Sequence, residues 1–349
     1  FMYEPPFANP YIIAAIGGRI YQIRVDTNNS VVNLTAAFPG TTMPANEPEF
    51  FFEQAEQFLI IQAGDLVTKP LFWDGSILRR SNGYIGVGAV PPLPANQLNE
   101  IPPAGPMDYY MGRLWYAFGR QYVAGDIVGS HASGSAAYNF RDSVLKVTEN
   151  PISLSGDGFI VPTMAGNIRA LEHSALLDTS LGQGQLYVFT RRQIYSTNVP
   201  PTRADWATLK EPLQRVAQID FGSVGARCVV PVNGDLFYQS MDGVRSLTLA
   251  IRNFTQWGNV PISRPEQRVI RFNDRALMRL ASGVNFDNRL WQTALPFQTA
   301  KGVAHQSAML LDFDLLGTIS DKLPPAWEGI YEGLDFLQLL EADFGGLQR

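Results

Sequence analysis

Residues 225–247 read GARCVVPVNGDLFYQSMDGVRSL. The stretch holds three short apolar runs, which are separated by the turn pairs Asn233-Gly234 and Asp242-Gly243. Glycine has no Cβ, so these pairs supply the positive φ angles that tight hairpin turns need. The pattern predicts three consecutive antiparallel strands. It also has a compact signature: a turn residue, a polar residue, Leu or Ile, and then an aromatic residue.

The same signature recurs along the chain. Its aromatic residue stands at positions 21, 115, 187, 237 and 291, and a degenerate copy places one at position 58. Blade repeats of propellers run at roughly 40 to 50 residues, which fits most of these intervals if each blade carries a modest loop. The sequence therefore predicts an all-β chain that folds as a single β-propeller domain over residues 1–349, with about six to seven blades. The alternative is a two-layer β protein that reuses the same hairpin chemistry.

Two regions are expected to depart from a regular blade repeat. The widest interval, between Trp115 and Tyr187, predicts an inserted segment over residues 125–165. We expect this segment to leave the blade core and to contact a neighbouring subunit or another protein. The apolar runs at 327–331 and 334–340 are expected to begin a seventh blade.

Two short helices are expected, over residues 202–213 and 263–273. Thr202 can start the first helix, because a Thr hydroxyl accepts from the free backbone amides of a helix start. Ser263 and Glu266 have the spacing of a capping box, with a proline inside the first turn.

Composition favours a folded protein with a lightly charged surface. Hydrophobic residues make up 46% of the chain and charged residues 17%, and the net charge is -5. A general nucleic-acid coat would carry a basic surface, so this class is not expected. Cys228 has no second cysteine to pair with and is predicted to be a buried, inert thiol. No apolar run reaches the roughly 20 residues of a membrane span, and the chain from Phe1 to Arg349 is expected to be part of a longer polypeptide.

The sequence predicts no catalytic residue, no cofactor and no metal site. His131, His173 and His305 have no cysteine or carboxylate at ligand spacing, and no phosphate loop or dinucleotide fingerprint is present. Asp312 and Asp314 would share one face of a strand. That arrangement suits acid–base chemistry or a cation, although a solvated strand edge is the commoner reason for it. We therefore predict that the chain is not an enzyme.

A series of arginines is the one charged feature above background. It comprises residues 264, 268, 271, 275 and 279. The spacing places Arg264, Arg268 and Arg271 on one face of the expected helix. Such a face can be solvated, can pair with acids of a neighbouring subunit, or can bind phosphate, because guanidinium groups match phosphate oxygens well. We predict that these three arginines form a contact face, with an adjoining protein in preference to DNA.

Several segments resemble the tail nozzle, or packaged-DNA stabilisation, proteins of short-tailed bacteriophages. They are LYVFTRRQIYST (186–197), FGSVGARCVVPVNGDLFYQSMDGVRSL (221–247) and SGVNFDNRLWQT (282–293), supported by YNFRDS (138–143) and LLEADFGGLQ (339–348). The resemblance covers residues 10–349 and rests on strand and turn patterns, without a diagnostic catalytic motif. Members of the family usually carry more chain, so a tip or docking domain is expected to be missing here.

The resemblance implies a structural protein of the virion tail. The family member would be a β-propeller subunit of a hexameric ring, which lies below the portal and adaptor in the head–tail connector complex. The ring would form a tail hub whose channel retains packaged double-stranded DNA and conducts it on ejection, without sequence specificity. The resemblance carries over no catalytic residue and implies no cofactor.

Two other classes of function remain open from the sequence. A carbohydrate- or receptor-binding propeller would use exposed aromatic residues, for which Trp73, Trp115, Trp257 and Trp291 are the candidates. A propeller hydrolase would place carboxylates, such as those of the Asp312 pair, around a central site.

Overall fold

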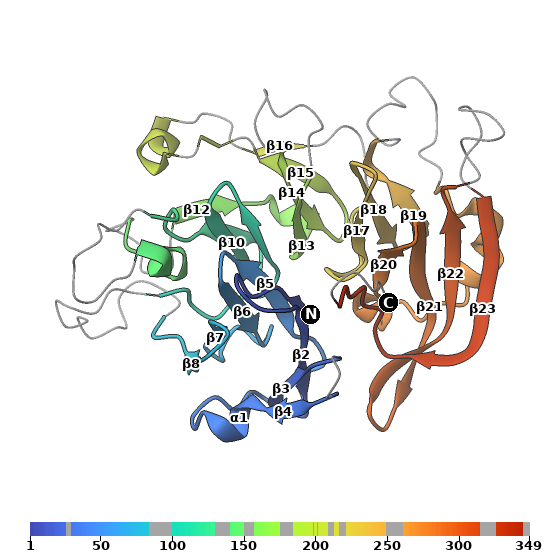
Figure 1. The fold of residues 1–349 in the computed structure, drawn as a ribbon. Helices are drawn as coiled ribbons and strands as arrows, with labels where there is room; N and C mark the ends of the chain where they lie inside the picture. The colour runs from blue at the N-terminus through green and yellow to red at the C-terminus, as the bar shows by residue number, and fades with distance from the viewer. Residues whose placement is uncertain are drawn as a thin grey trace. The chain divides into compact units, whose positions relative to one another are not determined.

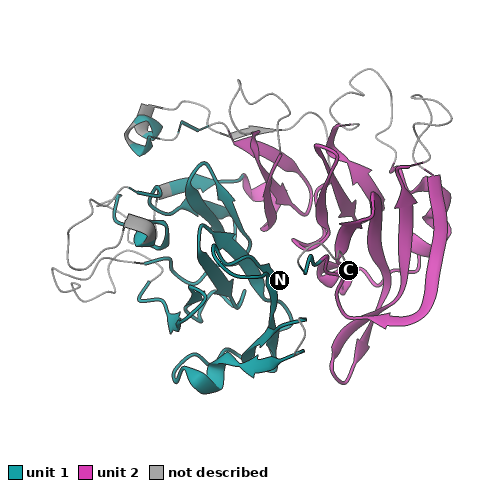
Figure 2. Ribbon diagram, in the orientation of Figure 1, with its two compact units in different colours: residues 1–161, 199–212, 342–349 teal, residues 162–198, 213–341 magenta. Residues whose placement is uncertain are grey.

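The computed structural model describes residues 1–25, 29–83, 100–129, 140–149, 157–174, 184–197, 199–200, 202–208, 213–215, 221–248, 261–314 and 326–344. The chain forms two compact units, which Figure 2 shows in different colours. Unit 1 contains residues 1–161, 199–212 and 342–349, and unit 2 contains residues 162–198 and 213–341.

Unit 1 is built from three four-stranded antiparallel sheets, in which each strand pairs with its neighbour in the sequence (Figure 1). The first sheet contains β1 (Met2–Tyr3), β2 (Tyr11–Ile16), β3 (Arg19–Ile23) and β4 (Val31–Asn33). The second contains β5 (Phe51–Ala55), β6 (Phe58–Gln62), β7 (Leu71–Trp73) and β8 (Leu78–Arg80). The third contains β9 (Met107–Tyr110), β10 (Arg113–Phe118), β11 (Gln121–Ala124) and β12 (Asp157–Ile160). Helical segments of this unit are short: α1 (Leu34–Ala37), η1 (Phe140–Leu145) and η4 (Arg203–Thr208).

Unit 2 contains two four-stranded sheets and one three-stranded sheet, again with sequential antiparallel strands. Its first sheet contains β13 (Ile168–His173), β14 (Leu186–Thr190), β15 (Ile194–Thr197) and β16 (Leu213–Arg215). The second contains β17 (Val229–Val232), β18 (Asp235–Ser240) and β19 (Gly243–Ser246). The third contains β20 (Gly283–Phe286), β21 (Arg289–Thr299), β22 (Gly302–Asp312) and β23 (Ala326–Phe336). The helical segments are η2 (Thr163–Ala165), η5 (Arg264–Glu266), α3 (Gln267–Ile270) and η6 (Met278–Leu280).

The middle sheet of unit 1 is covered on both faces. All five residues of β6 are buried. Leu59 and Ile61 belong to the core shared with the first sheet, whereas Phe58 and Ile60 belong to the core shared with the third sheet. Side chains alternate between the two faces of a strand, so one apolar run can fill two cores.

The middle sheet of unit 2 repeats this arrangement. Leu236 and Tyr238 of β18 pack in one core, and Phe237 between them packs in the other. Sheets that pack face to face on both sides are the building principle of propeller blades. The chain is thus an all-β protein of the β-propeller class, with three blade sheets in each unit.

The predicted turn chemistry is confirmed for Asn233-Gly234 and Gly17-Gly18. It is not confirmed for Asp242-Gly243, because Ser240 pairs with Gly243 and the central residues of the β18–β19 turn are Met241 and Asp242. In the β17–β18 hairpin, Asn233 and Gly234 have φ angles of 51° and 79°. In the β2–β3 hairpin, Gly17 and Gly18 have φ angles of 56° and 75°. Positive φ at both central residues matches the twist of the flanking strands. The predicted burial of Cys228 is also confirmed, because this residue is 0% exposed.

The recurring aromatic residue marks the same place in five of the six sheets. It lies on the second strand in β6, β10, β14, β18 and β21, and on the third strand, β3, of the first sheet. The hairpin that precedes it therefore joins the first two strands of a blade in most cases.

One expectation about the blades is wrong, and a second is wrong for the residues that the structure describes. Residues 326–336 form one strand, β23, which pairs with β22 and completes the sixth sheet, so they do not begin a seventh blade. The described part of residues 125–165 does not leave the core either. Val144 and Leu145 are fully buried in the core of unit 1, and β12 pairs with β11 as the fourth strand of its sheet.

Candidate contact surface and arginine pocket

The segment that carries the arginine series is not one helix. Within residues 263–273, η5 is followed by the single turn of α3. The capping box predicted at Ser263 does not form, because Ser263 makes no side-chain cap hydrogen bond. Its hydroxyl instead accepts from the backbone N–H of Val244 at 2.9 Å, which ties the segment to β19.

The structure separates the three predicted contact residues. Arg264 lies in η5 and Arg268 in α3, and both are exposed. Arg271 follows α3, is exposed, and lines a pocket that neither of the other two reaches. Arg275, four residues further on, lines the same pocket. The structure thus brings Arg271 together with Arg275, while the contact role of Arg264, Arg268 and Arg271 stays a prediction.

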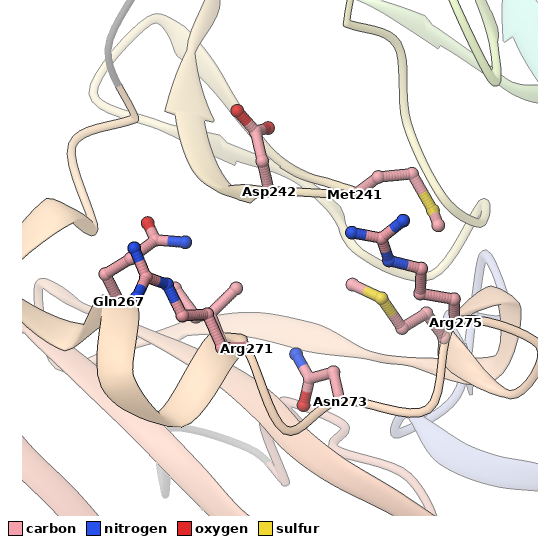
Figure 3. Close-up of a pocket in the computed structure, with 8 residues that line it drawn as sticks. Met241, Asp242, Gln267, Arg271, Asn273 and Arg275 are labelled. Carbon is pink, nitrogen blue, oxygen red and sulfur yellow. The ribbon is translucent and has the colours of Figure 1, made fainter.

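The pocket lies in unit 2 between the β18–β19 turn and the segment from α3 to η6. Its volume is about 210 Å³, and it is lined by Met241, Asp242, Gln267, Ile270, Arg271, Asn273, Arg275 and Met278. Figure 3 shows the side chains of Gln267 and Arg271 on one side of the space and that of Arg275 on the other. Its polar lining is richer in donors than in acceptors, which favours an anionic ligand over a cation.

The paired aspartates of β22 form part of an ion cluster. Arg289 lies 3.4 Å from Asp312 and 3.8 Å from Asp314, and it also contacts Asp287 and Glu328. Asp312 and Asp314 therefore lie on the same side, as predicted, but one guanidinium joins them. Both carboxylates therefore have a cationic partner in this cluster.

The aromatic candidates for carbohydrate binding lie mostly in the interior. Trp73 and Trp115 are 3% and 1% exposed. Trp291 is partly buried and packs on Tyr331 with a ring-centroid distance of 5.1 Å. Trp257 lies outside the described residues. An exposed binding platform therefore cannot use Trp73 or Trp115.

The described histidines occupy different environments. His305 is fully buried in β22, where its Nδ1 lies 3.3 Å from the carbonyl oxygen of Phe336. Burial lowers the pKa of His305 below its ordinary value. His173 is a partly buried residue of β13, and His131 lies outside the described residues.

No motif in the sequence indicates the buried charge cluster around Glu100. The carboxylate of Glu100 accepts two hydrogen bonds from Arg79, at 2.9 and 3.0 Å, and one from Lys146 at 2.5 Å. It also accepts from the backbone N–H of Asn82. Glu100 lies within a stretch rich in Gly, Pro and Ala (84–106) that reads as a plain connection, so the acid before Ile101 is the only local signal.

A second cluster docks η4 onto the third sheet of unit 1. Glu149 contacts Arg113 at 2.7 Å and Arg203 at 3.4 Å. Arg203 donates to the carbonyl oxygens of Ala124 and Gly125 at the end of β11. Burial, followed by the positive charge of Arg113, lowers the pKa of Arg203. These contacts are structural, since they fix one segment of the unit to another.

Two carboxylates lie close together on the first strands of neighbouring sheets in unit 1. Glu53 of β5 accepts a hydrogen bond from the backbone N–H of Tyr109 at 3.2 Å, next to Asp108 of β9. Burial, followed by the negative charge of Asp108, raises the pKa of Glu53 well above its ordinary value and outweighs that hydrogen bond. Folding thus favours the protonated form of Glu53 relative to the unfolded chain.

We expect Glu53→Gln to raise the free energy of unfolding near pH 8. A carboxyl whose pKa is raised on folding contributes its stability below the unfolded pKa, and this contribution is lost as the pH rises through the folded pKa. The glutamine mimics the protonated acid, so the gain should vanish near pH 4. Urea titrations of parent and variant across this range measure the effect, and Glu4→Gln, at an exposed position of the same unit, is the control. A constant difference at all pH values would contradict the expected protonation.

Within the described residues, no helix combines the length and the apolarity that crossing a membrane requires.

The chain is similar to solved structures, but no protein family is identified for it. No protein-family profile and no curated protein sequence matches the chain. Among solved structures, the chain is similar to U3-55K at 9% identity and a TM-score of 0.48, covering 96% of this chain and 82% of that one. It is similar to a streptogramin B lyase at 9% identity and a TM-score of 0.42, covering 88% of each chain. A protein from Lactobacillus plantarum is similar at 14% identity and a TM-score of 0.42, covering 91% of this chain and 94% of that one.

Proposed function

We propose that this chain is a structural subunit of a short phage tail. In this role it forms the nozzle or hub as a hexameric ring below the portal and adaptor, retains packaged double-stranded DNA and conducts it on ejection. The supporting observation is the sequence resemblance of residues 186–197, 221–247 and 282–293 to the nozzle family. These segments carry the hairpins β14–β15, β17–β18–β19 and β20–β21, which supply one or more strands to every sheet of unit 2.

The described fold suits a mechanical role. A channel wall has to keep its shape while DNA under pressure passes it, and close-packed apolar cores have low compressibility. In both units the middle sheet fills a core on each of its faces. The proposed activity needs no catalytic residue, and the two aspartates with the best spacing for catalysis are joined by Arg289.

The oligomeric state of the purified full chain tests the proposal. We expect six-fold rings in electron micrographs and a hexamer mass by mass photometry. The triple variant Arg264→Ala, Arg268→Ala, Arg271→Ala should weaken assembly roughly tenfold or more, because interface ion pairs can lose several kcal/mol when one partner is removed. Added salt should weaken the parent rings in the same direction.

Arg191→Ala, Arg192→Ala is the matched control, because these two arginines are exposed in the β14–β15 turn of the same unit. A chain that stays monomeric at all concentrations would contradict the nozzle proposal. Rings that form equally well in parent, control and triple variant would contradict only the contact role of the arginines. Particles that assemble with the triple variant but lose their genome would assign the three arginines to DNA.

A further inference from the structure

Asn273 holds an unpartnered donor at the arginine pocket. Its Oδ1 accepts a hydrogen bond from the backbone N–H of Leu295 at 2.7 Å. A backbone N–H can only donate, so this bond fixes which end of the amide is oxygen. The Nδ2 group therefore points the other way, and Figure 3 shows it directed into the pocket. Asn273 is 8% exposed, and its Nδ2 has no hydrogen-bond partner.

A buried donor of this kind requires explanation. Most buried polar groups in proteins have a partner, and leaving one without a partner costs free energy. Asn273 cannot turn its amide to find another partner without losing the bond to Leu295. A ligand that accepts a hydrogen bond inside the pocket would satisfy the group.

The charges around the pocket indicate the sign of that ligand. Neither Arg271 nor Arg275 forms an ion pair or a side-chain hydrogen bond within the part of the chain that the structure describes. Asp242, the one acid in the lining, is bonded to Arg245 at 2.6 Å and accepts from Ser240. The negative charge in the lining is thus compensated, whereas its two positive charges are not.

We infer that the pocket is a binding site for a phosphate group, held by Arg271, Arg275 and the amide of Asn273. Figure 3 shows Arg271 and Arg275 on opposite sides of the space, with Asn273 between them. A tetrahedral anion offers oxygens in each of these directions, whereas the two oxygens of a carboxylate lie in one plane. A volume of about 210 Å³ leaves room for the group and for part of what carries it. The inference is independent of the proposed tail function.

Calorimetric titration of the full chain with inorganic phosphate, in a buffer of low chloride, tests the site. Parent protein should bind phosphate at one site. Asn273→Asp should weaken binding roughly tenfold or more, because it keeps the acceptor for Leu295 but replaces the donor with a negative oxygen. Arg271→Gln and Arg275→Gln should each weaken binding by a similar factor. Arg279→Gln should bind like the parent, since Arg279 is an exposed arginine of η6 outside the lining.

Competition identifies the source of the phosphate. A short DNA duplex that displaces phosphate from the parent, but does not bind Asn273→Asp, would support the site and assign it to nucleic-acid backbone. Phosphate binding that duplex DNA leaves unchanged would support the site and assign it to a free phosphate compound. Three results would overturn the inference: no phosphate binding by the parent at millimolar concentrations, equal binding by parent and all pocket variants, or displacement of phosphate by equimolar acetate. Circular dichroism of each variant verifies that the fold is kept.

Discussion

Glu100→Ala is expected to lower the free energy of unfolding by about 3–5 kcal/mol, the range seen when one partner of a buried ion pair is removed. Glu100 is 2% exposed and is shared by two cations, Arg79 and Lys146. The alanine variant removes the acid from both while Lys146 stays buried. Urea unfolding of parent and variant measures the loss. Glu4→Ala changes an exposed glutamate of the same unit and should be close to neutral.

The loss should depend on pH in a defined direction. Burial raises the pKa of Glu100, but the hydrogen bonds and charges of Arg79 and Lys146 outweigh burial and lower it overall. A carboxyl whose pKa is lowered on folding stabilises the protein above the unfolded pKa, and this stability is lost as the pH falls through the folded pKa. Parent and Glu100→Ala should therefore converge in strong acid. A difference that grows with acidity would contradict the ion cluster.

Trp206→Ala is expected to cost about 3–5 kcal/mol, as large-to-small changes of buried aromatic residues do. Trp206 is 6% exposed, and its ring lies 5.4 Å from that of Trp115. The guanidinium groups of Arg113 and Arg203 lie over it at 5.5 and 5.0 Å, and its N–H donates to Pro200. This one side chain therefore holds η4 on the third sheet of unit 1.

Trp206→Phe is the matched variant for this prediction. It keeps an aromatic ring but loses the hydrogen bond to Pro200, so its cost should be clearly smaller. Denaturant unfolding gives the stability, and near-ultraviolet circular dichroism reports the stacked Trp115–Trp206 pair. A Trp206→Ala protein as stable as the parent would show that η4 contributes little to unit 1.

The sequence predicted the strands of this protein better than their grouping. The apolar runs FLIIQ (58–62) and LFW (71–73) form strands β6 and β7. Turn residues bound both runs, so the local sequence is enough to locate these strands. The runs at 327–331 and 334–340 read as the start of a seventh blade, because a strand pattern does not show which strand it pairs with. Pairing of β23 with β22 is a tertiary outcome.

The candidate site shows the same limit. Helical spacing predicts that Arg271 lies on one face with Arg264 and Arg268. In the structure α3 ends before Arg271, which lines a pocket together with Arg275. Ser263 has the residue type and spacing of a helix cap, but its hydroxyl accepts a hydrogen bond from the backbone N–H of Val244 instead. Buried pairs such as Glu100 with Lys146 join residues 46 positions apart. No periodicity in a single sequence encodes such a pair.

Unit 1 is assembled from three separate segments of the chain, which affects the order in which the two units can fold during synthesis. Its residues come from 1–161, 199–212 and 342–349, and Ala342 is 4% exposed. A ribosome releases the chain from its first residue onward, and domains generally fold as units during synthesis. Unit 1 therefore cannot be completed until Trp206 and then Ala342 have been synthesised. All residues of unit 2 have been made by then, so unit 1 begins before unit 2 along the chain and is completed after it.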